Sequence, residues 1–398
     1  MLSKPPFFLK ASLSLIGLML TGLLIYIGQD ILVPIAFSIL LAILLLPLNN
    51  WMEKKKVPRV VAISISLVLS LTFIGGVIWF LSMQIAGFAD DLPAIKKQVT
   101  MHYYTVIHWL HDKFHLSYTK QMEYISNATE TIKSKGGGMI QSTLLSVTDA
   151  LLLLVLIPIY TFLILYYRPM IRKFFMDVFD QKHSEHVKHV LNHSKLVVQN
   201  YMVGLLIEMG IVAALNTVGF MIVGIQYAIF LAVLTAVLNM VPYVGMLIAN
   251  VFCILVTLTT SQNFGDIFGV VVVMIVVQFI DNNFLMPRIV GSKVKINSLI
   301  TIIGVLIGGA LCGVSGMFIA IPSIAILKTI FDRVDELKPW GMLLGDEITT
   351  YEPSVIYRRL TTWKQKPNSI VPQKVEIPAN ISPSSTVAAT PTETGAQS

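Results

Sequence analysis

Long apolar stretches separated by short polar ones run along most of the chain, and their lengths predict its elements. The stretches long enough for a membrane helix cover roughly residues 11–28, 31–48, 60–82, 144–167, 200–222 and 266–283. A helix of about 17 to 25 apolar residues crosses the ~30 Å hydrocarbon core of a bilayer. The pattern therefore predicts six full transmembrane helices.

Two further apolar stretches, 228–260 and 298–330, are interrupted in their middle. The interrupting residues are Asn239, Pro242, Tyr243 and Gly245 in the first stretch, and Gly308, Gly309, Gly313, Ser315 and Gly316 in the second. Non-helical backbone at membrane depth must be buried in protein or line a wet cavity. We predict two re-entrant helical hairpins, although two short full crossings in each stretch, giving eight or more helices, fit the same pattern.

The order of these elements resembles an inverted repeat. Helix 200–222 is followed by one interrupted stretch, and helix 266–283, of opposite orientation, is followed by the other. Inverted repeats of this kind place a transported substrate near the bilayer midplane, between the broken helices. We therefore predict that residues 200–335 form a transport core.

Composition supports the membrane interpretation. Hydrophobic residues make up 55% of the chain, charged residues 13%, and mean hydropathy is +0.74, whereas soluble domains carry about a quarter charged residues. The formal net charge of +7 does not indicate nucleic acid binding, because lysine and arginine cluster in the loops. With alternate membrane crossings, all the lysines and arginines that lie outside residues 85–140 fall on one side of the membrane. The positive-inside rule then predicts that both termini lie in the cytoplasm.

Five regions follow from the loops between the apolar stretches. They are an N-terminal three-helix membrane segment (1–84), a small extracytoplasmic helical insertion (85–140), a transmembrane helix with a cytoplasmic interfacial helix (141–199), the helix-hairpin/helix-hairpin core (200–335) and a cytoplasmic, largely disordered tail (336–398). The predicted fold class is an all-α polytopic membrane protein.

Carboxylates inside apolar stretches are the strongest candidates for function, because a charge at the bilayer centre costs at least about 2.5 to 3.5 kcal/mol. Glu208 lies well inside its stretch, where it serves either proton or ion coupling or a structural hydrogen bond to another helix. Gln278, Asp281 and Asn282 share a helical face, and Asn283 follows. This face either points inward, toward substrate or the hairpin ends, or forms a polar cap at the membrane interface.

Enzymatic and metal chemistry are not predicted. The Gly313-Val-Ser-Gly316 step resembles the GxSG motif of rhomboid proteases, but no histidine lies in a membrane stretch to act as a base. Three histidines between 186 and 193 share a helical face without a further ligand. Cys253 and Cys312 lie singly in apolar stretches, and no Walker A phosphate loop is present. We expect no cofactor and no metal.

The stretch from Gln278 to Lys328 closely resembles the C-terminal signature of the autoinducer-2 exporter family of bacterial inner-membrane permeases. The matching residues are Gln278, Asp281, Pro287, Arg288, Gly291, Gly308, Gly309, Gly313, Gly316, Ala320 and Pro322. LNMVPYVG, residues 238–245, is similar to a second motif of that family. The resemblance extends loosely over about residues 1–340, and Ser298 departs from it where members often carry proline.

This resemblance implies export of a small polyhydroxylated signalling molecule, oligomeric assembly and, in some relatives, cation/proton antiport. We predict a secondary transporter, a permease or exporter, of a small polar solute such as the autoinducer-2 quorum-sensing signal, driven by a proton or sodium gradient. The alternatives are a monovalent cation/proton antiporter acting through Glu208 and Asp281, and a non-transporting membrane scaffold. The predicted partners are the solute, the coupling ion, the lipid bilayer and further copies of the chain.

The predicted substrate or ion pathway comprises Glu208, Asn239, Pro242, Tyr243, Gly245, Gln278, Asp281, Asn282, Asn283, Pro287, Arg288, Gly308, Gly309, Ser315, Gly316 and Pro322.

Overall fold

The computed structural model describes residues 7–90, 153–178, 184–241, 244–261, 263–291, 296–335 and 337–346, all within one compact unit, Met1–Glu347. Helices account for nearly all of these residues, and no strand occurs among them. The helices are α1 (Phe7–Ile27), α2 (Gln29–Lys54), α3 (Arg59–Asp90), an unlabelled helix (Leu153–Tyr166), α6 (Arg168–Val178), α7 (Ser184–Val223), α8 (Ala228–Asn239), α9 (Val244–Thr260), α10 (Phe264–Ile280), the π-helix η2 (Asp281–Gly291), α11 (Ser298–Phe331) and α12 (Lys338–Leu344). The all-α prediction is confirmed.

The surface of these helices is apolar. Five helical segments are long and apolar enough to cross a membrane: Gln29–Lys54, Arg59–Gly87, Val187–Val223, Gly265–Ile289 and Ser298–Phe331. A sixth is added if the helix Leu153–Tyr166 and α6, bent by 65° from each other, count as one. Leu18, Trp79 and Ile222 are 73%, 67% and 80% exposed, which suits lipid rather than water. The chain is a multi-pass membrane protein.

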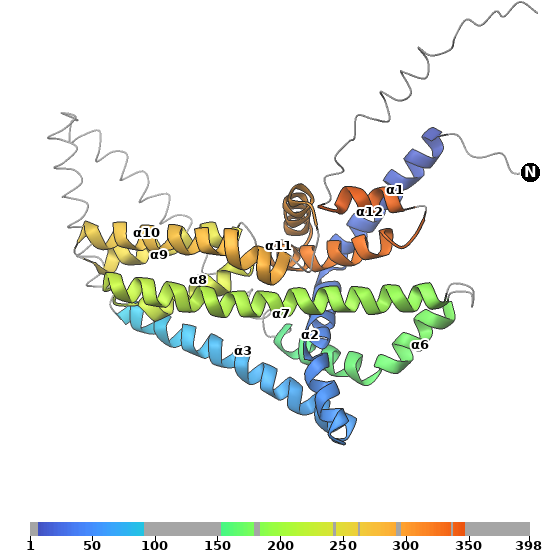
Figure 1. The fold of residues 1–398 in the computed structure, drawn as a ribbon, viewed down its shortest axis with the longest axis horizontal. Helices are drawn as coiled ribbons and strands as arrows, with labels where there is room; N and C mark the ends of the chain where they lie inside the picture. The colour runs from blue at the N-terminus through green and yellow to red at the C-terminus, as the bar shows by residue number, and fades with distance from the viewer. Residues whose placement is uncertain are drawn as a thin grey trace, which may run out of the picture. The chain divides into compact units, whose positions relative to one another are not determined.

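Helix α7 packs against α2, α6, α8, α10, η2 and α11. It has 40 residues and is therefore about 60 Å long. It begins 16 residues before the apolar stretch predicted at 200, because Ser184–Gln199 contains no glycine or proline that would stop a helix. It ends where Gly224 takes φ +85° and the Ile225 N–H donates to Phe220 O at 3.0 Å, a glycine-terminated helix end. Figure 1 shows α7 running past α8 and α11.

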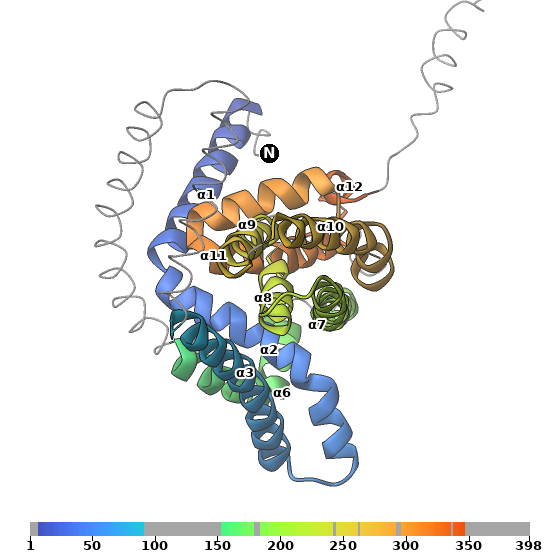
Figure 2. The same cartoon turned by 90° about the vertical axis from the view of Figure 1, so that its left-hand side faces the viewer.

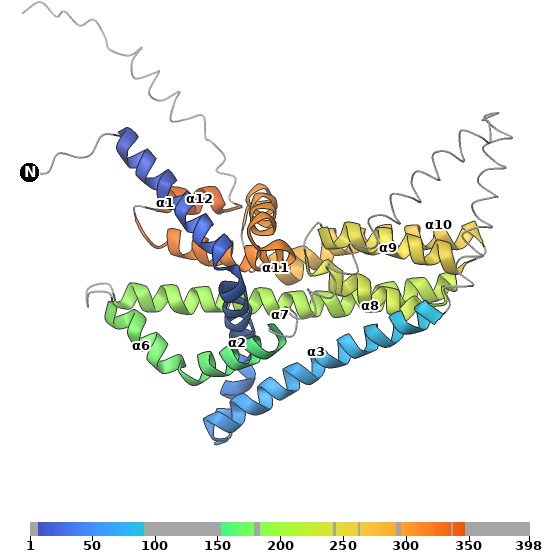
Figure 3. The same ribbon diagram turned by 180° about the vertical axis from the view of Figure 1, so that it is seen from behind.

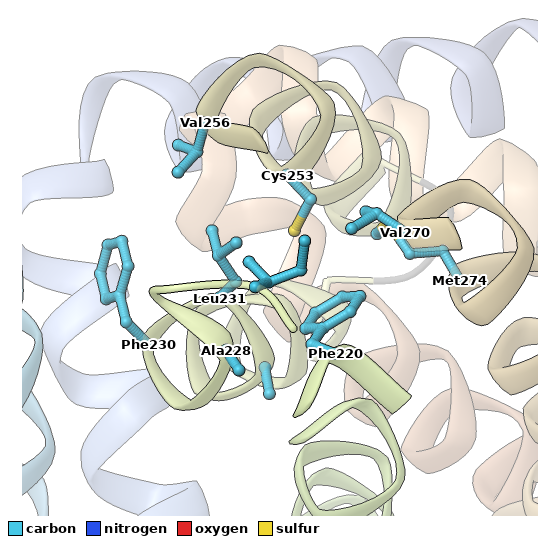
Figure 4. Packing of buried hydrophobic residues seen from close by; sticks show 10 residues of the cluster. Phe220, Ala228, Phe230, Leu231, Cys253, Val256, Val270 and Met274 are labelled. Atoms are coloured by element: carbon cyan, nitrogen blue, oxygen red, sulfur yellow. The ribbon is translucent and has the colours of Figure 1, made fainter. Parts of the chain in front are cut away.

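The first interrupted stretch forms two short helices, α8 and α9, which pack against each other. Helix α8 also packs against α7, and α9 packs against α10. Figure 2 shows α7 and α8 side by side, both seen nearly end-on. Buried apolar side chains form a core among these helices, and Figure 4 shows Phe220 of α7, Leu231 of α8, Cys253 of α9 and Val270 of α10 pointing toward one another. The predicted interruption is therefore confirmed in position, between Asn239 and Val244.

The second interrupted stretch, α11, folds back on itself at a single point. Cys312 and Gly313 have non-helical backbone angles, and Gly313 takes φ +59°, which favours glycine. A Cβ atom at Gly308 would clash with the Gly316 backbone of the returning arm. The sequence predicted helix disruption at Gly308 and Gly309 as well, and this is wrong, because both lie within regular helix and serve the close approach of the two arms.

Helix α2 crosses α7 and also packs on α3 and α11, as Figure 3 shows from behind. Polar contacts support the apolar packing, since the Ser66 hydroxyl donates to Asn49 Oδ1 at 2.9 Å between α2 and α3. Arg59 Nη2 donates to Leu165 O at 2.6 Å and joins α3 to the helix Leu153–Tyr166. Such hydrogen bonds between helices stabilise packing in a lipid environment, where water offers no alternative partner.

Two predicted regions fall largely outside the described residues. The extracytoplasmic insertion predicted at 85–140 is described only to Asp90, where α3 ends, and the tail only to Asp346. The interfacial helix predicted after Arg168 corresponds to α6, whose Phe174 and Phe175 side chains are exposed.

Candidate functional site

Two buried carboxylic acids from different elements meet beside α7. Glu208 lies on α7 and Asp281 is the first residue of η2, and their side chains are 5% and 4% exposed. Each carboxyl group lies close enough to act electrostatically on the other. Two adjacent carboxylate charges repel strongly when buried, so such a pair holds a proton or a cation between them.

Asn239 fixes the orientation of Asp281. This asparagine is the last residue of α8, and its Nδ2 donates to Asp281 Oδ2 at 3.1 Å. Near the start of α9, Gly245 lies against the Leu238 carbonyl of α8, where a Cβ atom would clash, so only glycine fits there. Pro242 and Tyr243, which the sequence places in the same motif, lie outside the described residues.

A small, partly enclosed cavity adjoins Asp281. Its volume is about 10 Å³, close to that of one water molecule. Its polar lining consists of Asn216, Thr235, Asn239, Asn250, Gln278 and Asp281, and its apolar lining of Val212, Met246, Met274 and Val277. The side chains come from α7, α8, α9, α10 and η2, so the cavity exists only when these helices are packed together.

Three buried oxygen atoms at this place receive no hydrogen bond from any described residue. They are Glu208 Oε2, Asn216 Oδ1 and Asp281 Oδ1. A buried acceptor without a donor costs roughly 1 to 3 kcal/mol. Asn216 and Asp281 line the cavity, whereas Glu208 does not, so the two oxygens in the cavity lining favour a positively charged or proton-donating occupant there. The chemistry of this donor set, carboxylate, amide and hydroxyl oxygens, suits a proton or a hard monovalent cation.

Asn216, Thr235 and Asn250 were not predicted from the sequence. Each is a single polar residue within an apolar stretch, and Asn216 lies eight residues after Glu208, close to two helical turns and hence on the same face. That spacing was a usable signal for Asn216. The sequence contains no comparable signal for Thr235 and Asn250, because only the packing of α8 and α9 brings them to the cavity.

The polar residues around Asp281 do not all face inward. Gln278 is half-buried and lines the cavity, whereas Asn282 is exposed and accepts a hydrogen bond from Gln278 Nε2 at 3.0 Å. Asn283 is also exposed and donates to Phe279 O at 2.8 Å. The predicted inward face is therefore formed by Gln278 and Asp281, and the backbone changes from α-helix to π-helix at this point. π-Helical turns occur frequently at functional sites.

The remaining predicted pathway residues lie elsewhere. Pro287 and Arg288 are exposed on η2. Ser315 and Pro322 lie on the returning arm of α11, with Gly308, Gly309 and Gly316 at the contact of its two arms. None of these seven lines the cavity beside Asp281.

Comparison with known proteins shows the family of the chain. The model of the AI-2E family transporter matches residues 15–336. The chain belongs to the AI-2E transporter family. Among relatives of this AI-2E family chain are the provisionally named transport protein YrrI of Bacillus subtilis, 26% identical over 76% of this chain and 86% of the relative, and a provisionally named transport protein of Haemophilus influenzae, 26% identical over 80% of this chain and 91% of the relative. A third is YhhT of Escherichia coli strain K12, which is 23% identical over 81% of this chain and 90% of the relative.

Proposed function

We propose that this AI-2E family protein is a secondary transporter that moves a small polar solute across the membrane and couples this movement to a proton or sodium gradient. The observation that supports it best is the buried Glu208–Asp281 pair, in which Asp281 lines a small polar cavity and each carboxyl group has an oxygen without a hydrogen-bond donor among the described residues. Intramembrane carboxylates of this kind mark proton and ion pathways. The family name supports autoinducer-2 as the first solute to test.

The coupling step follows from the electrostatics of the pair. A bound proton or cation neutralises part of the charge and lets α7 and η2 pack closely. Its release leaves two like charges in contact, and their repulsion favours separation of the two elements. An ion that binds one packing arrangement better than the other shifts the equilibrium between them, which is what coupling to a gradient requires.

Transport assays in vesicles test the proposal. The purified full chain is reconstituted into proteoliposomes, and uptake and efflux of a panel of small polar solutes, including autoinducer-2, are measured under imposed proton and sodium gradients. We expect solute flux that depends on one of the two gradients. A complete absence of flux for every solute and gradient would favour a membrane scaffold instead.

A monovalent cation/proton antiporter is the second candidate, and the size of the cavity favours it. A volume of about 10 Å³ accommodates a dehydrated cation or a water molecule but no organic solute. In this case sodium or lithium ions added outside acidic vesicles would drive proton exit without any organic solute, which a pH-sensitive dye inside the vesicles detects. Solute flux that depends on a gradient would decide for the first candidate.

A further inference from the structure

A second, much larger cavity lies far along α7 from the carboxylate pair. It has a volume of about 1080 Å³ and is bordered by α2, α6, α7, α11 and the helix Leu153–Tyr166. One part of its lining is aliphatic, with Ile35, Ile39 and Ile43 of α2 and Ile330 of α11. We call this cavity the basic groove, because four cations line the other part: Arg168, Arg172, Lys173 and Lys195.

The cations of the basic groove are close together and poorly neutralised. Lys195 on α7 lies within electrostatic range of both Arg168 and Arg172. Arg168 has partners, since its Nη1 donates to Asn50 Oδ1 at 2.9 Å and its Nη2 lies 3.8 Å from Glu53 Oε2. Arg172 and Lys195 form no ion pair with any described residue. Among the described residues of the lining Asp177 is the one acid, so these residues together carry a net positive charge.

A buried donor points to the same ligand chemistry. The Ser194 hydroxyl oxygen is fully buried in the lining of the groove and has no hydrogen-bond partner among the described residues. A phosphate group would accept hydrogen bonds from guanidinium, ammonium and hydroxyl groups together. The groove thus offers several donors for one anionic group, next to an apolar channel.

We propose that the basic groove binds an anionic phospholipid, with its phosphate between Arg172 and Lys195 and an acyl chain along the isoleucines of α2. The combination of cations and aliphatic surface in one cavity fits an amphiphile better than a soluble anion, which would leave the apolar part empty. Basic pockets between membrane helices on the cytoplasmic side are known to bind acidic lipid head groups. Our topology prediction places Arg168 and Lys195 on that side.

Lipid retention measured by native mass spectrometry tests the proposal without any transport assay. The full chain in detergent is titrated with phosphatidylglycerol or phosphatidylcholine of the same acyl composition. We expect one phosphatidylglycerol per chain to be retained with roughly tenfold preference over phosphatidylcholine. The Arg172→Gln/Lys195→Gln double variant is expected to lose this preference. The Lys188→Gln/Arg333→Gln double variant, which removes two exposed cations outside the groove, is expected to keep it.

Two further variants keep the test decisive if the first one folds poorly. The charge-retaining double variant Arg172→Lys/Lys195→Arg should bind phosphatidylglycerol as the wild type does. Ile39→Trp keeps every cation but fills the apolar part, and should lower retention about tenfold. Unchanged lipid preference in Arg172→Gln/Lys195→Gln, or equal protection against thermal unfolding by inorganic phosphate and by phosphatidylglycerol, would overturn the lipid assignment. Because binding is measured directly, these outcomes do not depend on whether the protein transports a solute.

Discussion

The Asp281 carboxyl group accepts a hydrogen bond through Oδ2 and has no donor for Oδ1 among the described residues. Asp281→Asn retains an acceptor for the Asn239 amide and removes the charge. We expect gradient-driven flux in proteoliposomes to fall roughly tenfold or more, a loss of about 1.4 kcal/mol, with thermal unfolding in detergent little changed. Nearly normal flux would indicate a capping role, since asparagine is an equally good cap.

The Glu208→Gln variant distinguishes two possible roles of this buried acid. If it carries the coupling proton or cation, Glu208→Gln should abolish the response of flux to the direction of the gradient. If it serves only as a hydrogen-bonding residue beside Asp281, glutamine can replace it and flux should persist. Asp30→Asn, which neutralises an exposed carboxylate at the start of α2, is the matched control and should leave flux unchanged.

Only some of the site residues could be predicted from the sequence. Glu208 and Asp281 stand out because ionisable residues are rare in apolar stretches, and Asn239 belongs to a motif that resembles a family signature. The cavity itself could not be predicted, because Thr235 and Asn250 reach it through the packing of α8 and α9. The outward direction of Asn282 depends on the transition to π-helix, for which the sequence contains no reliable signal.

Among the elements, α11 makes the clearest stability prediction. Gly316 faces the Gly308 carbonyl across the hairpin, and the backbone there cannot move aside for a Cβ atom. We expect Gly316→Ala to destabilise the protein by about 1 to 3 kcal/mol. Gly75→Ala on α3, where a Cβ atom meets nothing within 4 Å, should stabilise by about 0.5 to 1 kcal/mol. Thermal unfolding in detergent compares the two, and equal midpoints would contradict the close packing of the arms.

The helices were predicted well where a long apolar run marks them and poorly where no such run is present. Apolar runs located α2, α3 and α10. The spacing of three histidines between 186 and 193 indicated a helical face there, but only the structure shows that this helix continues without a break into the apolar stretch at 200. The fold-back of α11 was expected, but only the backbone shows that it occurs at Cys312 and Gly313.

For the molecule as a whole, the distribution of basic residues gives a topology that can be tested. A reporter fused after Lys56 or at the C-terminus should report cytoplasm, and one fused near Lys120 the opposite side, because loops rich in lysine and arginine stay inside. A cytoplasmic signal at Lys120 would overturn the orientation. It would also place the basic groove in the outer leaflet.

The unbroken length of α7 has a mechanical consequence. Glu208 lies 24 residues after Ser184 and 15 before Val223, so the helix has arms of about 36 Å and 22 Å on either side of it. A stiff rod that pivots at this point acts as an unequal lever. A tilt of about 10° would carry the Ser184 end roughly 6 Å and the Val223 end roughly 4 Å in opposite directions. A change of charge at one side chain could thus open one end of the bundle while it closes the other.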